Sequence, residues 1–467
     1  MSGSAKFLMF AVALVIGVGV YFVVQRDEEL RSAVPAATQP PAAATPPPAT
    51  TAPAPSTPPA PAAASETSVS ELYQSCVGRA FPTRAEAGDR AAACSKALQT
   101  RQLAPNQIAQ ARLTRGVART LLGDGALASE DYIDAVQRYD QLIDPRNPSA
   151  LNLYRRAAAL DGLGETDKAL EGYTAAINAD PKASLAFLGR GVLLAVRKRA
   201  YNRAVEDFDK VLVIDPDNVE ALIARGEAFS NLGDIARAMN DLNRAVTLAP
   251  GRADARLARG LLESRRGDRV AARKDYEAVL SADPRNVDAL VNLAALDLAV
   301  GKADAAIKLL DRALAIDDKN ALAFYNRGYA HFALRQYEPA IADYSSAIQF
   351  DPRMGVAYNN RALVRAIVGT DLVQALADSD EALKLQPANL DVRDTRGFIF
   401  LKLGDPSLAL NEYNAALTFD PNRAISLWGR GLAEIRLGNT IAGKNDQAAA
   451  TTINPEVAQD FAIYGLH

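Results

Sequence analysis

Apolar and polar residues divide the chain into three parts with different patterns. Residues 7–24 form an uncharged apolar run, residues 32–65 consist almost entirely of Pro, Ala, Thr and Ser, and the rest mixes apolar and polar residues with a regular period. An α-helix rises about 1.5 Å per residue, so the run reaches the lower length limit for crossing a bilayer. It predicts a single transmembrane helix at about 7–24, within an N-terminal membrane anchor of residues 1–31.

The residues after the run favour an uncleaved anchor. Gln25, Arg26 and Asp27 follow it directly, and such a polar segment is a poor site for signal-peptide cleavage. A cleaved signal peptide is the alternative. Lysine or arginine flanks the run on both sides, so counting these charges does not decide the topology.

Residues 32–65 contain eleven of the 25 prolines in the chain. Proline lacks a backbone donor and favours the polyproline II conformation, so this stretch cannot build a core. We expect a disordered linker that extends to roughly 100 Å at about 3.1 Å per residue. Such a spacer would hold a folded domain away from a membrane.

Proline recurs through the remaining sequence every 34 to 36 residues, with one interval of 68 in which Asp318 takes its place. The positions are Pro145, Pro181, Pro216, Pro250, Pro284, Pro352, Pro387, Pro421 and Pro455. Small and aromatic residues recur at fixed offsets between these prolines. Residues 321–354 and 390–423 share glycine at position 8, alanine at 20 and 27, and tyrosine at 24: Gly328, Ala340, Ala347 and Tyr344, and then Gly397, Ala409, Ala416 and Tyr413. Leu-Gly pairs near position 14, such as Leu403-Gly404, predict left-handed helix caps.

This spacing resembles the tetratricopeptide repeat, in nine consecutive copies over residues 150–457 and a divergent copy over 109–149. The resemblance implies an all-α, right-handed superhelical solenoid of helix-turn-helix repeats. An irregular N-terminal helical cap over residues 66–108 and a C-terminal capping segment over 458–467 would close its ends. The family implies binding of other proteins rather than catalysis.

Comparison of the copies reveals a further regularity of charge. Position 7 is arginine in nine of ten copies and position 23 is acidic in eight, whereas one copy carries Leu293 and Leu309 at these positions. The charge and the countercharge therefore disappear together. We interpret them as partly buried ion pairs, because a planar guanidinium suits bidentate pairing. A basic stripe for acidic ligands is the alternative. The clearest predicted pairs are Arg225–Asp241, Arg259–Asp275, Arg327–Asp343 and Arg361–Asp378.

The first helix of each repeat lines the inner face in this family, so its inward positions predict a peptide-binding groove. The candidates are aromatic, apolar or asparagine: Tyr325, Asn326, Tyr329, Asn360, Leu363, Phe398 and Trp428. In related repeats an asparagine at this place hydrogen-bonds the main chain of an extended peptide; a purely structural role is the alternative. The lysine and asparagine set that binds chaperone tails in related repeats is absent. An extended apolar peptide or an amphipathic helix fits this groove better. Packing of some of these aromatic residues under the C-terminal cap is the alternative.

Cys76 and Cys94 are the two cysteines. Residues 71–80 and 89–100 are predicted helices joined by a turn at 81–83, and two such helices can bring the cysteines together. The pair also resembles the cysteines at the front of many exported bacterial repeat proteins. We therefore expect a disulfide, which requires an oxidising compartment. Two unrelated, reduced core cysteines are the alternative.

Composition narrows the function. Histidine occurs twice and cysteine twice, so the chain has few residues that could build a metal cluster or a histidine-based catalytic centre. The net charge of −3 gives no reason to expect nucleic acid as a partner. We expect a non-enzymatic, cofactor-free scaffold in a bacterial inner membrane, single-pass, with its repeats in the periplasm. A holdase-like periplasmic chaperone is the alternative, and a regulatory repeat subunit of a glycosyltransferase system is a remote one.

Overall fold

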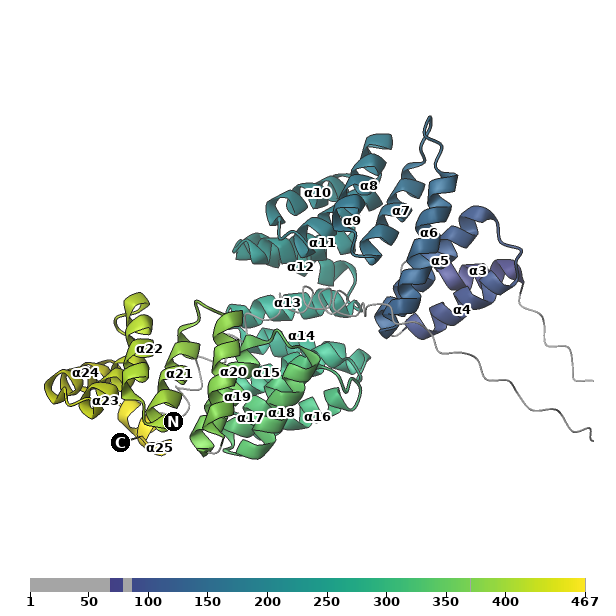
Figure 1. Cartoon of the computed structure of the whole chain (residues 1–467). Coiled ribbons are helices and arrows are strands. Elements are labelled where there is room, and N and C mark those ends of the chain that lie inside the picture. Colours follow the sequence, from purple (N-terminus) through teal and green to yellow (C-terminus); the bar gives the residue numbers. More distant parts are fainter. Residues whose placement is uncertain (1–67, 79–85, 370, 467) are drawn as a thin grey trace, which may run out of the picture. The chain divides into compact units, whose positions relative to one another are not determined.

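The computed structural model describes residues 68–78, 86–369 and 371–466, and these residues are all-α, without a strand (Figure 1). They form an all-α solenoid of 23 helices. The predicted transmembrane helix at 7–24 and the linker at 32–65 lie outside the described residues. Contacts divide the described chain into two compact units, one ending at Asp241 and the other beginning at Leu242.

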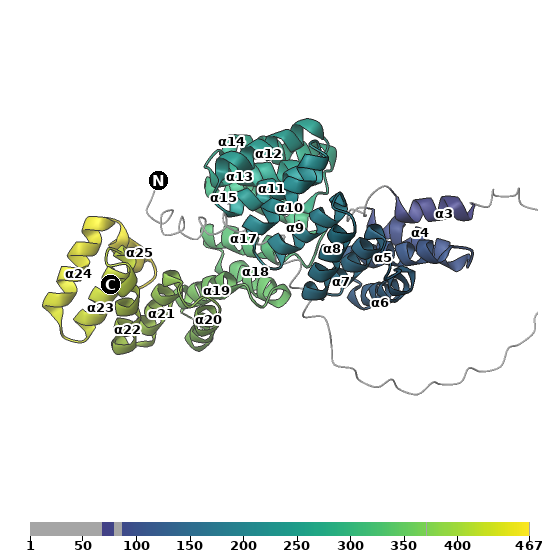
Figure 2. The ribbon, with the colours of Figure 1, turned by 90° about the horizontal axis from the view of Figure 1, so that it is seen from above.

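The unit that ends at Asp241 holds the helices α3 (Val69–Val77), α4 (Ala87–Gln99), α5 (Pro105–Leu122), α6 (Gly125–Leu142), α7 (Ala150–Gly162), α8 (Thr166–Ala179), α9 (Ser184–Val196), α10 (Tyr201–Ile214), α11 (Val219–Asn231) and the first half of α12 (Ile235–Leu248). From α3 to α11 consecutive helices pair along the chain, and α3, α4 and α5 pack against one another (Figure 2).

The unit that begins at Leu242 holds the rest of α12 and the helices α13 (Ala253–Arg265), α14 (Arg269–Ala282), α15 (Val287–Ala299), α16 (Ala303–Leu314), α17 (Ala321–Ala333), α18 (Tyr337–Phe350), α19 (Gly355–Val368), α20 (Leu372–Leu385), α21 (Leu390–Leu403), α22 (Pro406–Phe419), α23 (Ala424–Arg436), α24 (Thr440–Ile453) and α25 (Val457–Ile463). The odd-numbered helices from α13 to α23 are the first helices of their repeats. Each of those from α13 to α21 also contacts the next first helix, and α23 contacts α25.

The predicted turns and close approaches explain why these segments form hairpins. Gly404 ends α21 in the left-handed conformation, with φ of 82° and ψ of 20°, which glycine adopts without a steric penalty. Gly397 lets α21 and α22 approach closely, because a Cβ there would lie 2.7 Å from the ring of Tyr413. Tyr413 is fully buried and fills this space.

The predicted bounds of the first helix are wrong at both ends. Ser68 and Glu71 form a capping box, in which each side chain bonds the other's backbone N–H, so α3 starts at Val69 instead of residue 71. Gly78 has a φ of 56° and ends the helix before residue 80. The second helix, α4, starts at Ala87 instead of residue 89 and ends at Gln99.

Candidate functional site

A cavity of about 90 Å³ opens in the second unit, between the first helices α17, α19, α21 and α23 and the C-terminal helix α25. Five of the seven predicted groove residues line it: Tyr325, Tyr329, Asn360, Leu363 and Phe398. They come from three successive repeats, at positions that the helical period places on one side of the array. The sequence therefore located the cavity by its aromatic and asparagine residues.

The other two predicted groove residues do not line this cavity. Asn326 is only 1% exposed, and its amide atoms have no hydrogen-bond partner within the described part of the chain. Trp428 is partly buried and packs against an apolar cluster that extends from α19 to α25 and includes Phe398. Asn326 is one helical position away from the lining residue Tyr325, and a shift of about 100° points its side chain away from the cavity.

Aromatic side chains form the apolar walls of the cavity. Tyr325 and Tyr329 are 2% and 4% exposed, and burial raises the pKa of both hydroxyls. The Nδ2 of Asn360 donates to the hydroxyl of Tyr325 at 3.1 Å. This asparagine therefore bonds a neighbouring repeat, as the structural interpretation of its position expects, while still lining the cavity.

The C-terminal helix α25 supplies one wall of the cavity, and Phe398 packs under it, as expected from the alternative in which some groove aromatics pack under the terminal cap. The Phe398 ring contacts Phe461 and Tyr464 edge-on, with centroids 6.1 and 6.3 Å apart. Lys402 donates from Nζ to the carbonyl oxygen of Tyr464 at 3.0 Å and holds the end of this helix in place. The aromatic pair at 461 and 464 was the available signal, but α25 has no other copy in the chain with which it could be compared.

Charged groups line the part of the cavity near α23. Arg423 donates from Nε to Asp394 at 2.5 Å and from Nη2 to Asp391. The hydroxyl of Ser426 donates to the second oxygen of Asp394, also at 2.5 Å. Burial raises the pKa of Asp394 to about 6, against the opposing effect of Arg423. Two carboxylates thus share one guanidinium.

Two further polar groups of the cavity are unpaired. Asp460 is 3% exposed and Asn359 is 8% exposed. Within the described residues, Oδ2 of Asp460 and Oδ1 of Asn359 accept no hydrogen bond. Burial, together with the charge of Glu456, raises the pKa of Asp460 to about 6.

The predicted charged pairs form in both units. Each arginine donates from Nε and Nη2 to both oxygens of its carboxylate, at 2.7 to 2.8 Å, in Arg225–Asp241, Arg259–Asp275, Arg327–Asp343 and Arg361–Asp378. The four carboxylates are at most 6% exposed. The groups that a basic stripe would present to ligands are therefore engaged within the repeats.

The same arginines also contact the preceding repeat, which the sequence comparison missed. Nη1 donates to the residue 16 positions earlier: Asp209, Asn243, Asp311 and Ser345 for the four arginines above. We call these groups the arginine ladder: the arginine, its carboxylate and the residue 16 positions before it. In the copy without arginine, Leu293 and Leu309 pack in an apolar cluster with Tyr276 instead.

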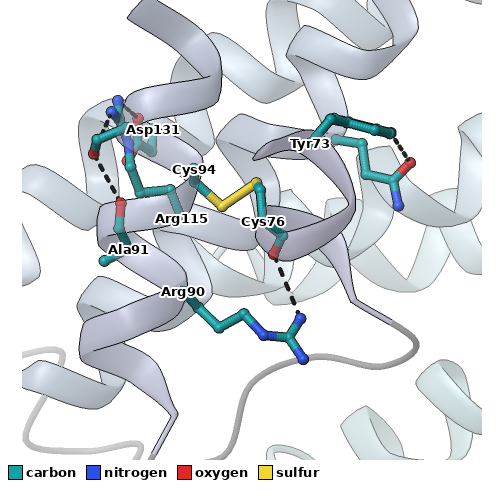
Figure 3. The surroundings of a disulfide bond; sticks show 9 residues. Tyr73, Cys76, Arg90, Ala91, Cys94, Arg115 and Asp131 are labelled. Atoms are coloured by element: carbon teal, nitrogen blue, oxygen red, sulfur yellow. Dashed lines mark hydrogen bonds and ion pairs between the residues drawn. A yellow bond between two sulfur atoms is a disulfide. The ribbon is translucent and has the colours of Figure 1, made fainter. Parts of the chain in front are cut away.

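The predicted disulfide is confirmed. Cys76 of α3 and Cys94 of α4 are bonded, with their Cα atoms 4.4 Å apart, and both are fully buried (Figure 3). Nearby, Arg90 donates to the carbonyl oxygen of Cys76 at 3.4 Å, and Tyr73 donates to Gln110 of α5 at 2.8 Å. The bond joins the first two helices of the described chain.

Over residues 68–78, 86–369 and 371–466, no group of histidine, cysteine and acidic side chains is arranged to hold a metal ion. No helix in these ranges combines the length and apolar character that a membrane span requires.

Known proteins share parts of this sequence and fold. A small glutamine-rich tetratricopeptide repeat-containing protein 2 from Mycosarcoma maydis is 32% identical over 96 residues, which are 21% of this chain and 27% of that protein. A tetratricopeptide repeat protein from Parabacteroides merdae is 18% identical, with a TM-score of 0.45, over 54% of this chain and 98% of that one. The Cut9–Hcn1 hetero-tetramer of the APC/C gives 17% identity and a TM-score of 0.48, over 82% of this chain and 90% of that one.

The family itself is matched in the middle of the chain. Residues 154–219, 193–259, 264–327 and 321–354 each match the tetratricopeptide repeat. These ranges contain three of the four arginine pairs described above and the first aromatic residues of the cavity. This chain therefore contains tetratricopeptide repeats.

Proposed function

We propose that the chain is a scaffold that binds an extended peptide or a short amphipathic helix of a partner protein at the cavity of α17, α19, α21, α23 and α25. The observation that carries the proposal is the cavity itself, where aromatic walls surround a few convergent polar groups. Binding sites commonly combine these features. Val356, Leu363 and Ile425 line the cavity and are only half-buried, so they offer apolar surface at its rim.

The proposal includes the tether and the compartment. An apolar segment at 7–24 would hold the chain in a bacterial inner membrane, and the linker at 32–65 would carry the repeats into the periplasm. The Cys76–Cys94 disulfide supports this side of the membrane, because such bonds persist in oxidising compartments. The repeats would then bring envelope partners together, without catalysing a reaction themselves.

The test is affinity purification of the full chain from its native membrane after crosslinking. The pocket variant is Leu363→Glu with Ile425→Glu, which places charge on the half-buried rim and spares buried residues such as Tyr329 and Phe398. The matched control is Val373→Glu with Phe419→Glu, because these side chains are 72% and 74% exposed and do not line the cavity.

We expect a defined partner to be recovered with the wild type and the control and to be lost with the pocket variant, while all three melt cooperatively. Equal recovery with the pocket variant would move the site elsewhere. Recovery of many unfolded proteins with every variant would favour the holdase alternative and contradict a scaffold for a defined partner.

A further inference from the structure

The charges of the cavity are unbalanced. Asp391, Asp394 and Asp460 line it, whereas Arg423 is the lining guanidinium. Arg423 bonds both Asp391 and Asp394, so its charge is already matched by carboxylates of the protein. Lys402 of α21 donates from its ammonium to the Tyr464 carbonyl oxygen, and its Nζ lies 6.0 Å from the Phe398 ring centroid. An anionic guest would therefore meet more negative than available positive charge.

Two unpaired acceptor groups of the cavity could each bind a hydrogen-bond donor. Oδ2 of Asp460 and Oδ1 of Asn359 are acceptors, each on a side chain more than nine-tenths buried, and neither has a partner within the described residues. A buried acceptor that lacks a hydrogen bond destabilises the folded protein, and a charged acceptor does so more strongly. A guest that donates a hydrogen bond to either acceptor would offset this cost.

The lining and the volume of the cavity indicate which kind of side chain fits it. Tyr325, Tyr329, Phe332, Phe398 and Phe461 give an apolar, aromatic lining, which suits an aliphatic stem and attracts a cation to the ring faces. A volume of about 90 Å³ corresponds to roughly six water-sized probes. This space is large enough for one long side chain of a bound peptide or helix.

We propose that the cavity binds the side chain of a lysine or arginine of the partner, with Asp460 and Asn359 accepting hydrogen bonds from its cationic group. The inference rests on the proposed function, since it names the residue by which the partner peptide is anchored. It also gives α25 a role in binding, because Asp460 comes from this helix.

The test uses the full chain in detergent and four pools of capped decapeptides. Each pool has random uncharged residues and one fixed central residue: lysine, arginine, glutamate or norleucine, the last having the stem of lysine without its charge. The variants are Asp460→Asn, which keeps the shape of the side chain, and Asn359→Leu. Asp304→Asn is the matched control, because Asp304 is an exposed acid of α16 in the same unit.

We expect the lysine and arginine pools to bind about tenfold or more tightly than the norleucine pool, and the glutamate pool to bind weakest. Asp460→Asn and Asn359→Leu should remove the preference for lysine and arginine over norleucine while the chain still melts cooperatively, and Asp304→Asn should behave as wild type. The inference is wrong if the norleucine pool binds as tightly as the lysine pool, or if the preference for lysine and arginine survives both pocket variants. In that case Leu363→Glu would still weaken the binding of all pools if the proposed function holds. If no pool responds to Leu363→Glu, both fail.

Discussion

Each arginine of the ladder bonds two second helices, one in its own repeat and one in the preceding repeat. Arg327, for example, donates to Asp343 of α18 and to Asp311 of α16. Asp343 is 6% exposed, whereas the side chain of Asp311 is 53% exposed. The buried bidentate pair therefore contributes most to the free energy of unfolding, and the exposed contact contributes little.

Arg327→Ala should lower the free energy of unfolding by about 3 kcal/mol, because it leaves the buried Asp343 carboxylate unpaired. The double change Arg327→Leu with Asp343→Leu imitates Leu293 and Leu309 and should recover most of this loss. Chemical denaturation measures both. Lys384→Ala is the control, since its pair with Glu381 is exposed and should contribute under about 1 kcal/mol. A double variant no more stable than Arg327→Ala would count against a structural pair.

Glu263 shows that proximity to an arginine does not ensure a favourable pair. Its Oε1 lies 3.8 Å from Nε of Arg259, but that Nε already donates to Asp275 at 2.7 Å. Burial, with a further contribution from the charge of Asp275, raises the pKa of Glu263 from 4.5 to about 7. The folded state therefore favours the protonated acid. The contribution of Glu263 to the free energy of unfolding is most favourable below pH 4.5 and is lost as the pH rises to about 7.

Glu263→Gln should remove this cost. At pH 8 the variant should be more stable than the wild type, with a free energy of unfolding about 1–2 kcal/mol higher. This difference should shrink as the pH falls through 7 toward 4.5. Denaturation at several pH values measures it, with Glu171→Gln, an exposed acid of α8, as the control. A variant less stable than the wild type at pH 8 would show that the contact with Arg259 prevails over burial.

The residues that sequence comparison identified and those it missed differ in one respect. Arg327 and Asp343 were found because the chain holds several copies, in which charge and countercharge vary together. The partner 16 positions earlier was missed because its type changes among Asp, Asn and Ser. Asp460 has no equivalent in the repeats, so only the structure places it in the cavity.

At the scale of the helix pair, glycine and tyrosine set the spacing. A Cβ on Gly397 would lie 2.7 Å from a ring atom of the fully buried Tyr413. Gly397→Ala should therefore lower the free energy of unfolding by about 1–3 kcal/mol through overpacking. Gly251→Ala is the matched control, because nothing lies within 4 Å of its Cβ position. Equal stability of the two variants would mean that α21 and α22 separate at little cost.

The helices were the easiest part to predict and their ends were the hardest. The 34-residue period and the Leu-Gly caps were enough for the repeat hairpins, and the φ of Gly404 agrees with its predicted cap. The first helix lies outside the period, and its ends depend on two local features, the Ser68–Glu71 capping box and the positive φ of Gly78. A hydrophobic pattern contains neither.

For the whole molecule, the disulfide links the fold to a compartment. We expect mass spectrometry of protein alkylated in its native membrane to find Cys76 and Cys94 bonded to each other. Protein expressed without residues 1–31 should instead carry two alkylated thiols, because it would stay in a reducing compartment. Free thiols in the full chain would contradict the proposed periplasmic location, while leaving the repeat fold unaffected.

The central claim is that the cavity of α17–α25 is where a partner binds, and photo-crosslinking in the native membrane tests it most directly. A photoreactive amino acid would replace Leu363 at the cavity rim or, as the control, Phe419, which is 74% exposed and does not line the cavity. We expect a discrete crosslinked product from position 363, abolished by Ile425→Glu in the same chain, and none from position 419. A discrete partner crosslinked from 419 and not from 363 would contradict the account.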